Sequence, residues 1–238
     1  MKIENLIQGT FLERPNRFTV IFEEKNGKKQ CKAHLKDPGR LKELLYPGVS
    51  LLLKKAPPST TRKTKFDVIA VLKNKLWVLI NSGFHSDLAT EIIESEIIDD
   101  FKEFKIEKRE YTFGKSRLDF LLRNSEKNRN MLLEVKGCTL VKDKLAQFPD
   151  APTTRGKRHL DELITGKTYG FESTVLFLIL KEDAEFFSPN YNTDPSFSKT
   201  LHKAQKKGVN IIPFVFKIYL KGNSIFIEPF KKIKLKFK

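Results

Sequence analysis

Two short segments of this sequence carry acidic and basic residues at the spacing of neighbours on one face of a β-strand. The first is SRLDF at residues 116–120, and the second is LEVKG at residues 133–137. Because successive side chains of a strand point to opposite faces, Glu134 and Lys136 share one face of theirs. If the two strands are neighbours, the carboxylates of Asp119 and Glu134 converge, with Lys136 beside them.

These residue types suit metal-assisted cleavage of a phosphodiester. Two carboxylates provide the oxygen ligands that Mg²⁺ or Mn²⁺ prefers, and such an ion keeps several waters for a substrate. An ion held in this way makes a nucleophile from water and neutralises charge on the phosphate. A neighbouring lysine can orient or deprotonate that water when burial and the metal lower its pKa. We therefore predict that Asp119, Glu134 and Lys136 are catalytic, with Asp119 and Glu134 as metal ligands.

The Glu134 and Lys136 pair also has a simpler explanation. Edge strands of a sheet often carry alternating charges that keep them soluble. The surrounding sequence favours a site, because residues 131–140 otherwise have the composition of a buried strand and Gly137 follows the lysine at once. A lysine beside a glutamate inside such a strand requires a partner or a function.

The composition of the chain predicts a soluble protein with an anionic partner. Its 238 residues are 39% hydrophobic, which supports an ordinary core, and the formal net charge is +16. Nucleic acid is a better candidate than a membrane because no apolar stretch is long enough to span a bilayer. Residues 1–82 contain 17 of the 45 Lys and Arg but only 7 of the 29 Asp and Glu, so the basic excess is greatest there. The alternative is that the lysines reflect genome bias or adaptation to heat.

Cysteine and histidine usage argues against a structural zinc site. Cys31 and Cys138 are the only cysteines, no C-x-x-C pair occurs, and the four histidines are scattered. No apolar signal segment opens the sequence. Together these features predict a protein of the reducing cytoplasm.

The first third of the chain has the pattern of a small all-β domain. We expect strands at residues 17–23, 28–35, 49–55, 66–73 and 75–80, a hairpin turn at Asn26-Gly27, and a short helix at residues 39–45. Five short strands in so few residues fit a closed or partly open barrel of the oligonucleotide-binding (OB) type. Such a barrel is a plausible platform for nucleic acid.

The apolar period changes from that of strands to that of a helix near residue 83. We therefore place the boundary there, with an OB-like domain at 1–82 and an α/β domain with a mixed sheet at 83–238. Apolar residues from Leu88 to Phe104 recur at helical spacing, with Ser86 or Asp87 as the cap. The further elements expected are a hairpin of 107–113 and 115–122 around Gly114, strands at 131–140, 173–180, 209–219 and 224–228, helices at 153–164 and 199–207, and a solvated basic tail at 231–238, for which a phosphate contact is the alternative.

Several basic side chains are candidates for contacts with nucleic-acid phosphates. The helix expected after Thr153 carries Arg155, Lys157 and Arg158, so a phosphate could meet both its positive end and these side chains. Such contacts position nucleic acid without reading its sequence. His159 follows them, and a structural role is more common for such a histidine than a catalytic one.

Three further basic residues complete this set. Lys36 and Arg40 would lie on the surface of the barrel, where Arg40 either binds phosphate or only completes a turn. Arg117 shares a strand face with Asp119. It either contacts nucleic acid or pairs with a carboxylate and so preorganises the site.

Motifs spread over nearly the whole chain resemble those of the sugar fermentation stimulation protein A (SfsA) family. The matching motifs, in order, are AHLKDPGRL at 33–41, YPG at 46–48, residues 114–120, EVKG at 134–137, FPDAPT at 148–153, RG at 155–156 with HL at 159–160, SPN at 188–190 and DP at 194–195. The resemblance implies an N-terminal OB-like domain, a C-terminal domain of the PD-(D/E)xK nuclease superfamily, and a DNA-binding role in the control of sugar utilisation. The superfamily motif then falls on Asp119, Glu134 and Lys136, with Leu118 in place of the usual proline.

The resemblance also implies further acidic ligands for the metal. Related nucleases often contribute an acidic residue from the first helix, where this chain has Glu91, although an exposed helical glutamate is the alternative. Glu110 precedes the Asp119 strand and would face the metal if the hairpin twists inward.

Three functions are consistent with these residues. The first is a metal-dependent nuclease acting on DNA, and the second is a non-catalytic DNA-binding regulator on a nuclease scaffold. No helix-turn-helix is evident, which weakens the case for sequence-specific operator recognition. The third is a binder of another polyanion or of a phosphorylated sugar. The sequence leaves the oligomeric state open, with a homodimer among the alternatives.

Overall fold

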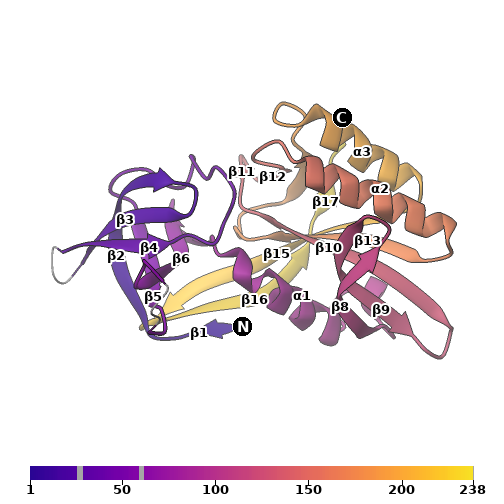
Figure 1. The fold of residues 1–238 in the computed structure, drawn as a ribbon, viewed down its shortest axis with the longest axis horizontal. Coiled ribbons are helices and arrows are strands. Elements are labelled where there is room, and N and C mark those ends of the chain that lie inside the picture. The colour runs from indigo at the N-terminus through magenta and orange to yellow at the C-terminus, as the bar shows by residue number, and fades with distance from the viewer. Residues whose placement is uncertain (26–28, 59–61, 238) are drawn as a thin grey trace.

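Six strands near the N-terminus form a sheet that closes into a barrel (Figure 1). The computed structural model describes residues 1–25, 29–58 and 62–237, so the predicted Asn26-Gly27 turn lies outside the described residues. Counted along the chain, the third and fifth strands of the barrel pair in parallel and close the barrel. This confirms the expected OB-type barrel. The strands in sheet order are β4 (Gln30–His34), β3 (Thr19–Glu24), β2 (Leu6–Asn16), β5 (Ser50–Lys55), β6 (Phe66–Lys73) and β7 (Leu76–Leu79).

The longest barrel strand, β2, was not predicted. Its pairing with β3 shifts register between Phe11 and Glu13 and again between Glu13 and Asn16. These irregularities break the alternation of apolar and polar residues by which a strand is recognised in a sequence.

The predicted helix at residues 39–45 is wrong, because that segment forms a single turn. The amide of Leu45 donates to the carbonyl of Leu41 at 2.8 Å, but no helix continues from it. Side chains satisfy the neighbouring backbone groups instead, since the Arg14 guanidinium donates to the carbonyls of Gly39 and Arg40. A helix would need those carbonyls for its own hydrogen bonds.

The rest of the chain is built around a seven-stranded mixed sheet, as expected. Its three middle strands are parallel and are connected by crossovers that contain α2 (Thr154–Thr168) and α3 (Pro195–Lys206). The remaining neighbours are antiparallel. The strands in sheet order are β1 (Lys2–Ile3), β16 (Ser224–Lys232), β15 (Asn210–Lys221), β13 (Glu172–Ile179), β10 (Arg129–Cys138), β9 (Ser116–Asn124) and β8 (Lys105–Phe113).

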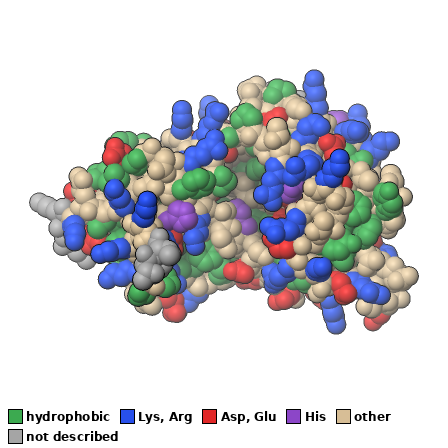
Figure 2. Space-filling view, viewed as in Figure 1, with side chains coloured by type: hydrophobic (Ala, Val, Ile, Leu, Met, Phe, Trp, Pro, Cys, Tyr) green, Lys and Arg blue, Asp and Glu red, His purple; other side chains and the backbone are tan. Residues whose placement is uncertain are grey.

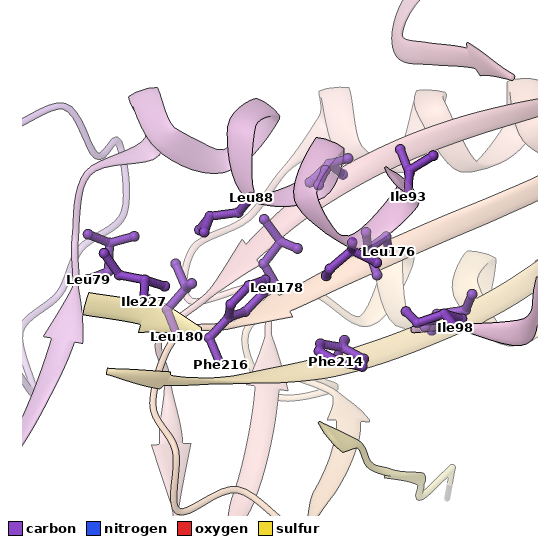
Figure 3. Close-up of a cluster of buried hydrophobic side chains, with 14 of the residues drawn as sticks. Leu79, Leu88, Ile93, Ile98, Leu176, Leu178, Leu180, Phe214, Phe216 and Ile227 are labelled. Carbon is purple, nitrogen blue, oxygen red and sulfur yellow. The ribbon is translucent and has the colours of Figure 1, made fainter. Parts of the chain in front are cut away.

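Helices cover both faces of this sheet (Figure 1). On one face, Leu88 and Ile93 of α1 (His85–Glu94) pack with Leu176, Leu178 and Phe216 of the central strands (Figure 3). On the other face, α2 and α3 pack against the alternate residues of β13. Buried residues of the barrel join the first of these clusters, so the barrel and the mixed sheet share a core. These barrel residues are Leu6, Leu52, Ile69, Ala70 and Leu79.

Two of the three α-helices in the described part of the chain begin with a side-chain cap. Thr153 caps α2 by accepting from the Gly156 amide at 3.0 Å, and Asp194 caps α3 by accepting from the Phe197 amide at 2.9 Å. The predicted cap of α1 at Ser86 or Asp87 is wrong, because a 3₁₀ turn, η1 (Ser82–Phe84), leads directly into that helix.

The helical pattern up to Phe104 is only partly realised. The helix α1 ends at Glu94, and Glu96 has a φ of 53°, a left-handed conformation that a helix cannot include. Beyond it, Phe101 lies in a second 3₁₀ turn, η2 (Asp99–Phe101), and is buried there. Most apolar residues of this period are buried although the helix does not continue, but Ile97 is 49% exposed.

The basic C-terminal segment is not a solvated tail. Lys231 and Lys232 complete β16, Ile233 is buried, and the chain then adds a strand to a second, small sheet. The strands of the small sheet in order are β11 (Val141–Lys142), β12 (Leu145–Phe148), β14 (Phe186–Pro189) and β17 (Lys234–Leu235).

The first residues of the chain contribute to the large sheet. Lys2 and Ile3 form β1 and pair with Phe226 and Ile225 of β16. The division of the chain at residue 83 stays a prediction. None of the helices in the described part of the chain combines the length and the apolar composition needed to cross a bilayer.

A carboxylate-rich turn joins the barrel to the mixed sheet. Asp150 Oδ2 accepts from the Arg40 amide at 2.8 Å, and Asp37 Oδ1 accepts from the Gly39 amide at 2.8 Å. Gly39 is required here, since an added Cβ would lie 2.6 Å from Asp150 Oδ2. Burial, together with the charge of Asp150, raises the pKa of Asp37 to about 6.

The substitution Asp37→Asn is expected to stabilise the protein at neutral pH but not at pH 4. Because the pKa of Asp37 is higher in the folded state than in the unfolded state, the wild type loses stability as the pH rises from about 4 to about 6. Asparagine keeps the oxygen that accepts from Gly39 and has no charge to bury. Denaturant unfolding should give a gain on the order of 2 kcal/mol at pH 7.5. A difference between the two proteins that does not change with pH would contradict this assignment.

Candidate metal-dependent active site

The candidate site lies where β9 and β10 separate. The two strands pair antiparallel from Arg129 opposite Asn124 as far as Leu133 opposite Phe120. Two residues further along β10, the amide of Val135 donates to Asp119 Oδ2 at 2.6 Å instead of to a backbone carbonyl. The carboxylate of Asp119 therefore occupies the opening between the strands, next to Glu134.

Asp119 is held in a position that disfavours its charge. Burial, together with the nearby charge of Glu134, raises the pKa of Asp119 to about 7, although the Val135 amide and Lys136 act in the opposite direction. A half-buried and a buried carboxylate side by side repel each other when both are ionised. A divalent cation between them would remove that penalty.

Glu134 is the most buried acidic residue of the site, with 2% of its surface exposed. Its Oε1 contacts both Lys136 Nζ and His159 Nδ1. Burial by itself would raise the pKa of Glu134, but the charge of Lys136 and the hydrogen bond from His159 outweigh burial and lower it. The carboxylate is therefore ionised in the folded protein.

The second oxygen of Glu134 is the feature of the site that best fits a metal ligand. Oε2 is buried and has no hydrogen-bond partner among the described residues. A buried carboxylate oxygen without a partner is costly, and a cation would satisfy it. The donor set of Asp119 and Glu134 consists of hard oxygens, which fits a divalent ion such as Mg²⁺, Mn²⁺ or Ca²⁺.

His85 is a neighbour of the site that the sequence did not reveal. Its ring, at the start of α1, lies against Gly137, where an added Cβ would be 2.5 Å from Nε2. Burial and the charge of Lys136 lower the pKa of His85 to about 4, so the ring is neutral. Its Nε2 has no partner among the described residues. The one sequence signal for it was Gly137, because a glycine directly after a site residue indicates a close approach.

The structure does not bring the two other predicted acidic ligands, Glu91 and Glu110, next to Asp119 and Glu134. Glu91 pairs with the N-terminal ammonium of Met1, at 2.9 Å from Oε2. Glu110 is exposed and pairs with Arg117 Nε at 2.5 Å, although its charge still contributes to the raised pKa of Asp119. Among the described residues, no group of three or more Asp, Glu, His or Cys side chains has the spacing of a metal site.

The predicted basic residues of α2 have partners within the protein. Arg155 Nε donates to His159 Nε2 at 3.3 Å, Arg158 Nε donates to Ser116 Oγ at 3.2 Å, and Lys157 pairs with Asp161 at 3.0 Å. Lys157 also leaves 44% of its side chain exposed. Figure 2 shows Lys and Arg side chains gathered over the N-terminal end of α2.

On the barrel, Lys36 and Arg40 are exposed, as predicted. Lys36 Nζ lies 3.8 Å from Asp67 Oδ2, a loose pairing that leaves the ammonium free to meet an anion. In Figure 2 a hollow separates the barrel from the helices, and Lys and Arg side chains occur on both of its sides.

One large pocket among the described residues lies away from the candidate site. It has a volume of about 980 Å³ and is lined entirely by residues of the barrel, among them Lys29, Cys31, Lys65 and Phe66. None of Asp119, Glu134 and Lys136 contributes to it. Cavity size therefore does not identify the candidate site, which is identified by the convergence of carboxylates and the lysine.

Comparison with known proteins gives matches along nearly the whole chain. A family described as "Sugar fermentation stimulation protein RE domain" matches residues 83–222, and one described as "SfsA N-terminal OB domain" matches residues 12–80. The sugar fermentation stimulation protein homolog of Methanothermobacter thermautotrophicus is 51% identical over 237 residues, which cover 100% of this chain and 96% of that protein. The homolog of Methanosphaera stadtmanae is 48% identical over 240 residues, covering 100% of this chain and 98% of that protein.

A solved structure has the same fold. The structure of Pyrococcus furiosus SfsA in complex with Ca²⁺ superposes with a TM-score of 0.88 at 27% sequence identity. The superposition covers 99% of this chain and 98% of that one.

Proposed function

Because this chain belongs to the sugar fermentation stimulation protein (SfsA) family, we propose that it binds DNA and cleaves it with the help of a divalent metal. The observation that carries the proposal is the state of Glu134, whose Oε1 contacts Lys136 while its buried Oε2 has no partner among the described residues. Asp119 lies beside it where two strands separate. This is the arrangement expected of the PD-(D/E)xK motif, and we assign residues 83–238 to that kind of nuclease domain.

Asp119 and Glu134 are the proposed ligands of Mg²⁺ or Mn²⁺. The Ca²⁺ complex of the Pyrococcus furiosus protein supports a divalent ion in this family. When bound, such an ion supplies a nucleophile from water at neutral pH and neutralises charge on the phosphate. Glu110 remains a candidate further ligand, because only an exposed ion pair with Arg117 holds it away. Glu91 is not part of the proposal, since its carboxylate is engaged by Met1.

Lys136 is proposed to stabilise the negative charge that develops during cleavage. Only 17% of its side chain is exposed, and its ammonium is held by Glu134 at the edge of the site. In surroundings of low polarity a fixed positive charge acts strongly on a developing negative one. The same ammonium is placed to orient an attacking water.

The basic surface is proposed to hold the DNA backbone. Lys36 and Arg40 would do so from the barrel, within an OB-type domain at residues 1–82, and Lys157 and Arg158 would do so from α2. Arg117 would contribute once DNA displaces its exposed pair with Glu110. These are contacts to phosphates, so binding should weaken steeply with salt and depend little on sequence.

The proposal predicts that Glu134→Gln abolishes cleavage without abolishing DNA binding. End-labelled single- and double-stranded DNA would be incubated with Mg²⁺, Mn²⁺ or EDTA. We expect metal-dependent products from the wild type and a rate about a thousandfold lower from the variant, because an amide is a poor ligand for a hard cation. Mobility shifts in EDTA should be equal, since Glu134 is buried away from the phosphate-binding surface.

The matched control is Glu107→Gln, which removes an exposed carboxylate of β8 outside the site. This variant should cut DNA at the wild-type rate. Intact DNA with every metal, shifted equally by all three proteins, would refute the nuclease proposal and leave a DNA-binding regulator on a nuclease scaffold.

A further inference from the structure

We propose that His159 is a positioning residue, which turns one oxygen of Glu134 inward and so leaves the other free for the metal. It does so as the middle of a hydrogen-bonded chain that begins at Arg155. The inference rests on the proposed function, because it takes Glu134 to be the metal ligand. It assigns to His159 and Arg155 a role different from the structural and phosphate-binding roles that their types first suggested.

The chain of contacts runs from α2 into the sheet. His159 is 2% exposed, and its Nδ1 contacts Glu134 Oε1. Its Nε2 lies 3.3 Å from Arg155 Nε, one helical turn earlier. Leu160 and Leu163 of the same helix are also buried, so α2 is fixed against the sheet and the ring has little freedom to move.

The partners of the ring determine which nitrogen carries its proton. A guanidinium can only donate hydrogen bonds, so Nε2 must accept from Arg155. The remaining proton is then on Nδ1, which donates to Glu134 Oε1. Arg155 therefore selects the tautomer that Glu134 requires, and a ring with the proton on Nε2 would leave two donors facing each other.

This donation divides the two oxygens of Glu134 into different roles. Oε1 receives Nδ1–H of His159 from the helix side and the ammonium of Lys136 from its own strand. Oε2 receives nothing from the described residues. Without His159 the carboxylate could rotate, and Lys136 could occupy either oxygen. Outer hydrogen bonds of this kind commonly change metal affinity by about tenfold to a hundredfold.

The test compares replacements of His159 in the full-length protein. His159→Asn keeps an N–H donor close to the place of Nδ1, whereas His159→Leu fills a similar volume without one. Calorimetric titration with Mn²⁺ alone, without DNA, measures the affinity of the site. We expect His159→Leu to bind Mn²⁺ about tenfold to a hundredfold more weakly, and His159→Asn to recover most of the loss.

Two further variants separate positioning from general effects on α2. Arg155→Met should weaken Mn²⁺ binding by a smaller factor, because no donor then fixes Nε2 of His159 as the acceptor. Lys167→Met, in the last turn of α2 and outside this chain of contacts, should leave the affinity unchanged. Thermal unfolding of each variant identifies any that fail to fold, and the tautomer of His159 can be read independently from the ¹⁵N shifts of its ring in the metal-free protein.

The outcomes separate the two proposals. A folded His159→Leu protein that binds Mn²⁺ as tightly as the wild type would overturn the positioning role and leave the nuclease proposal intact. A ring protonated on Nε2 in the wild type would overturn it as well. A wild type that neither binds Mn²⁺ nor cuts DNA would instead overturn the proposed function, and the metal-directed role of His159 with it.

Discussion

Replacing Lys136 by methionine is expected to slow metal-dependent DNA cleavage by about a thousandfold while the protein stays folded and binds DNA. Methionine keeps the length of the side chain in a place where only 17% of it is exposed, but it removes the charge. It also frees Oε1 of Glu134 from its contact with the ammonium. Metal affinity should therefore be maintained or increased, and the loss of rate should appear in the cleavage step.

Single-turnover cleavage with saturating Mg²⁺ and excess protein measures that step directly. Lys136→Arg is the informative companion, since it keeps a positive charge but cannot release a proton near neutral pH. Partial activity in the arginine variant would indicate that charge stabilisation dominates, and none would indicate proton transfer by the lysine. A methionine variant that cuts DNA at the wild-type rate would remove Lys136 from the proposed active site.

The largest expected effect on stability is that of Gly137→Ala, about 3 kcal/mol in the free energy of unfolding. The added methyl group would overlap the ring of His85, with only 2.5 Å to Nε2. His85 is the first residue of α1, and the same helix inserts Leu88 and Ile92 into the core. Either the ring or the backbone of β10 must move to make room, and a shift of β10 would move Lys136 with its neighbour. Urea unfolding of the variant measures the loss of stability, and Mn²⁺ titration measures the effect on the candidate site.

A double-mutant cycle tests the cause. His85→Ala removes the ring that the new methyl group would meet, so Gly137→Ala should cost much less in that background. The coupling between the two changes should be favourable and comparable in size to the cost of the single substitution at residue 137. Additive losses would show that the cost arises from the backbone of β10 rather than from His85.

Regular periodicity determined which elements could be predicted. The β8–β9 hairpin around Gly114, the strand β10 and the two capped helices α2 and α3 have clean local patterns, and the structure contains all of them. The strand β2 was missed because of its bulges, and the strands of the small sheet are only two to four residues long. The segment at 39–45 was misjudged because Arg14 and Asp150, far away in sequence, determine its conformation.

Some residues of the candidate site could be predicted from local patterns in the sequence, and others could not. Asp119, Glu134 and Lys136 could be named from the sequence because strand spacing puts Glu134 and Lys136 on one face, and the resemblance to the SfsA family places a motif on all three residues. His159 and His85 could not be assigned, because each comes from a helix whose packing no local pattern reports. Glu91 has a suitable residue type on a suitable helix, but its carboxylate is engaged by Met1. Such a contact between distant parts of the chain cannot be read from composition or spacing.

The pairing of β1 with β16 has a consequence for how the protein is made. Lys2 and Ile3 are synthesised about 220 residues before their partners, Phe226 and Ile225. The N-terminal barrel is closed by contacts between residues that are nearer to each other in the sequence. It can therefore form while translation continues. Until β16 is available, Ile3 and Leu6, both buried in the finished protein, remain uncovered on the nascent chain. A chain stalled before residue 224 would therefore display an apolar N-terminal strand to chaperones.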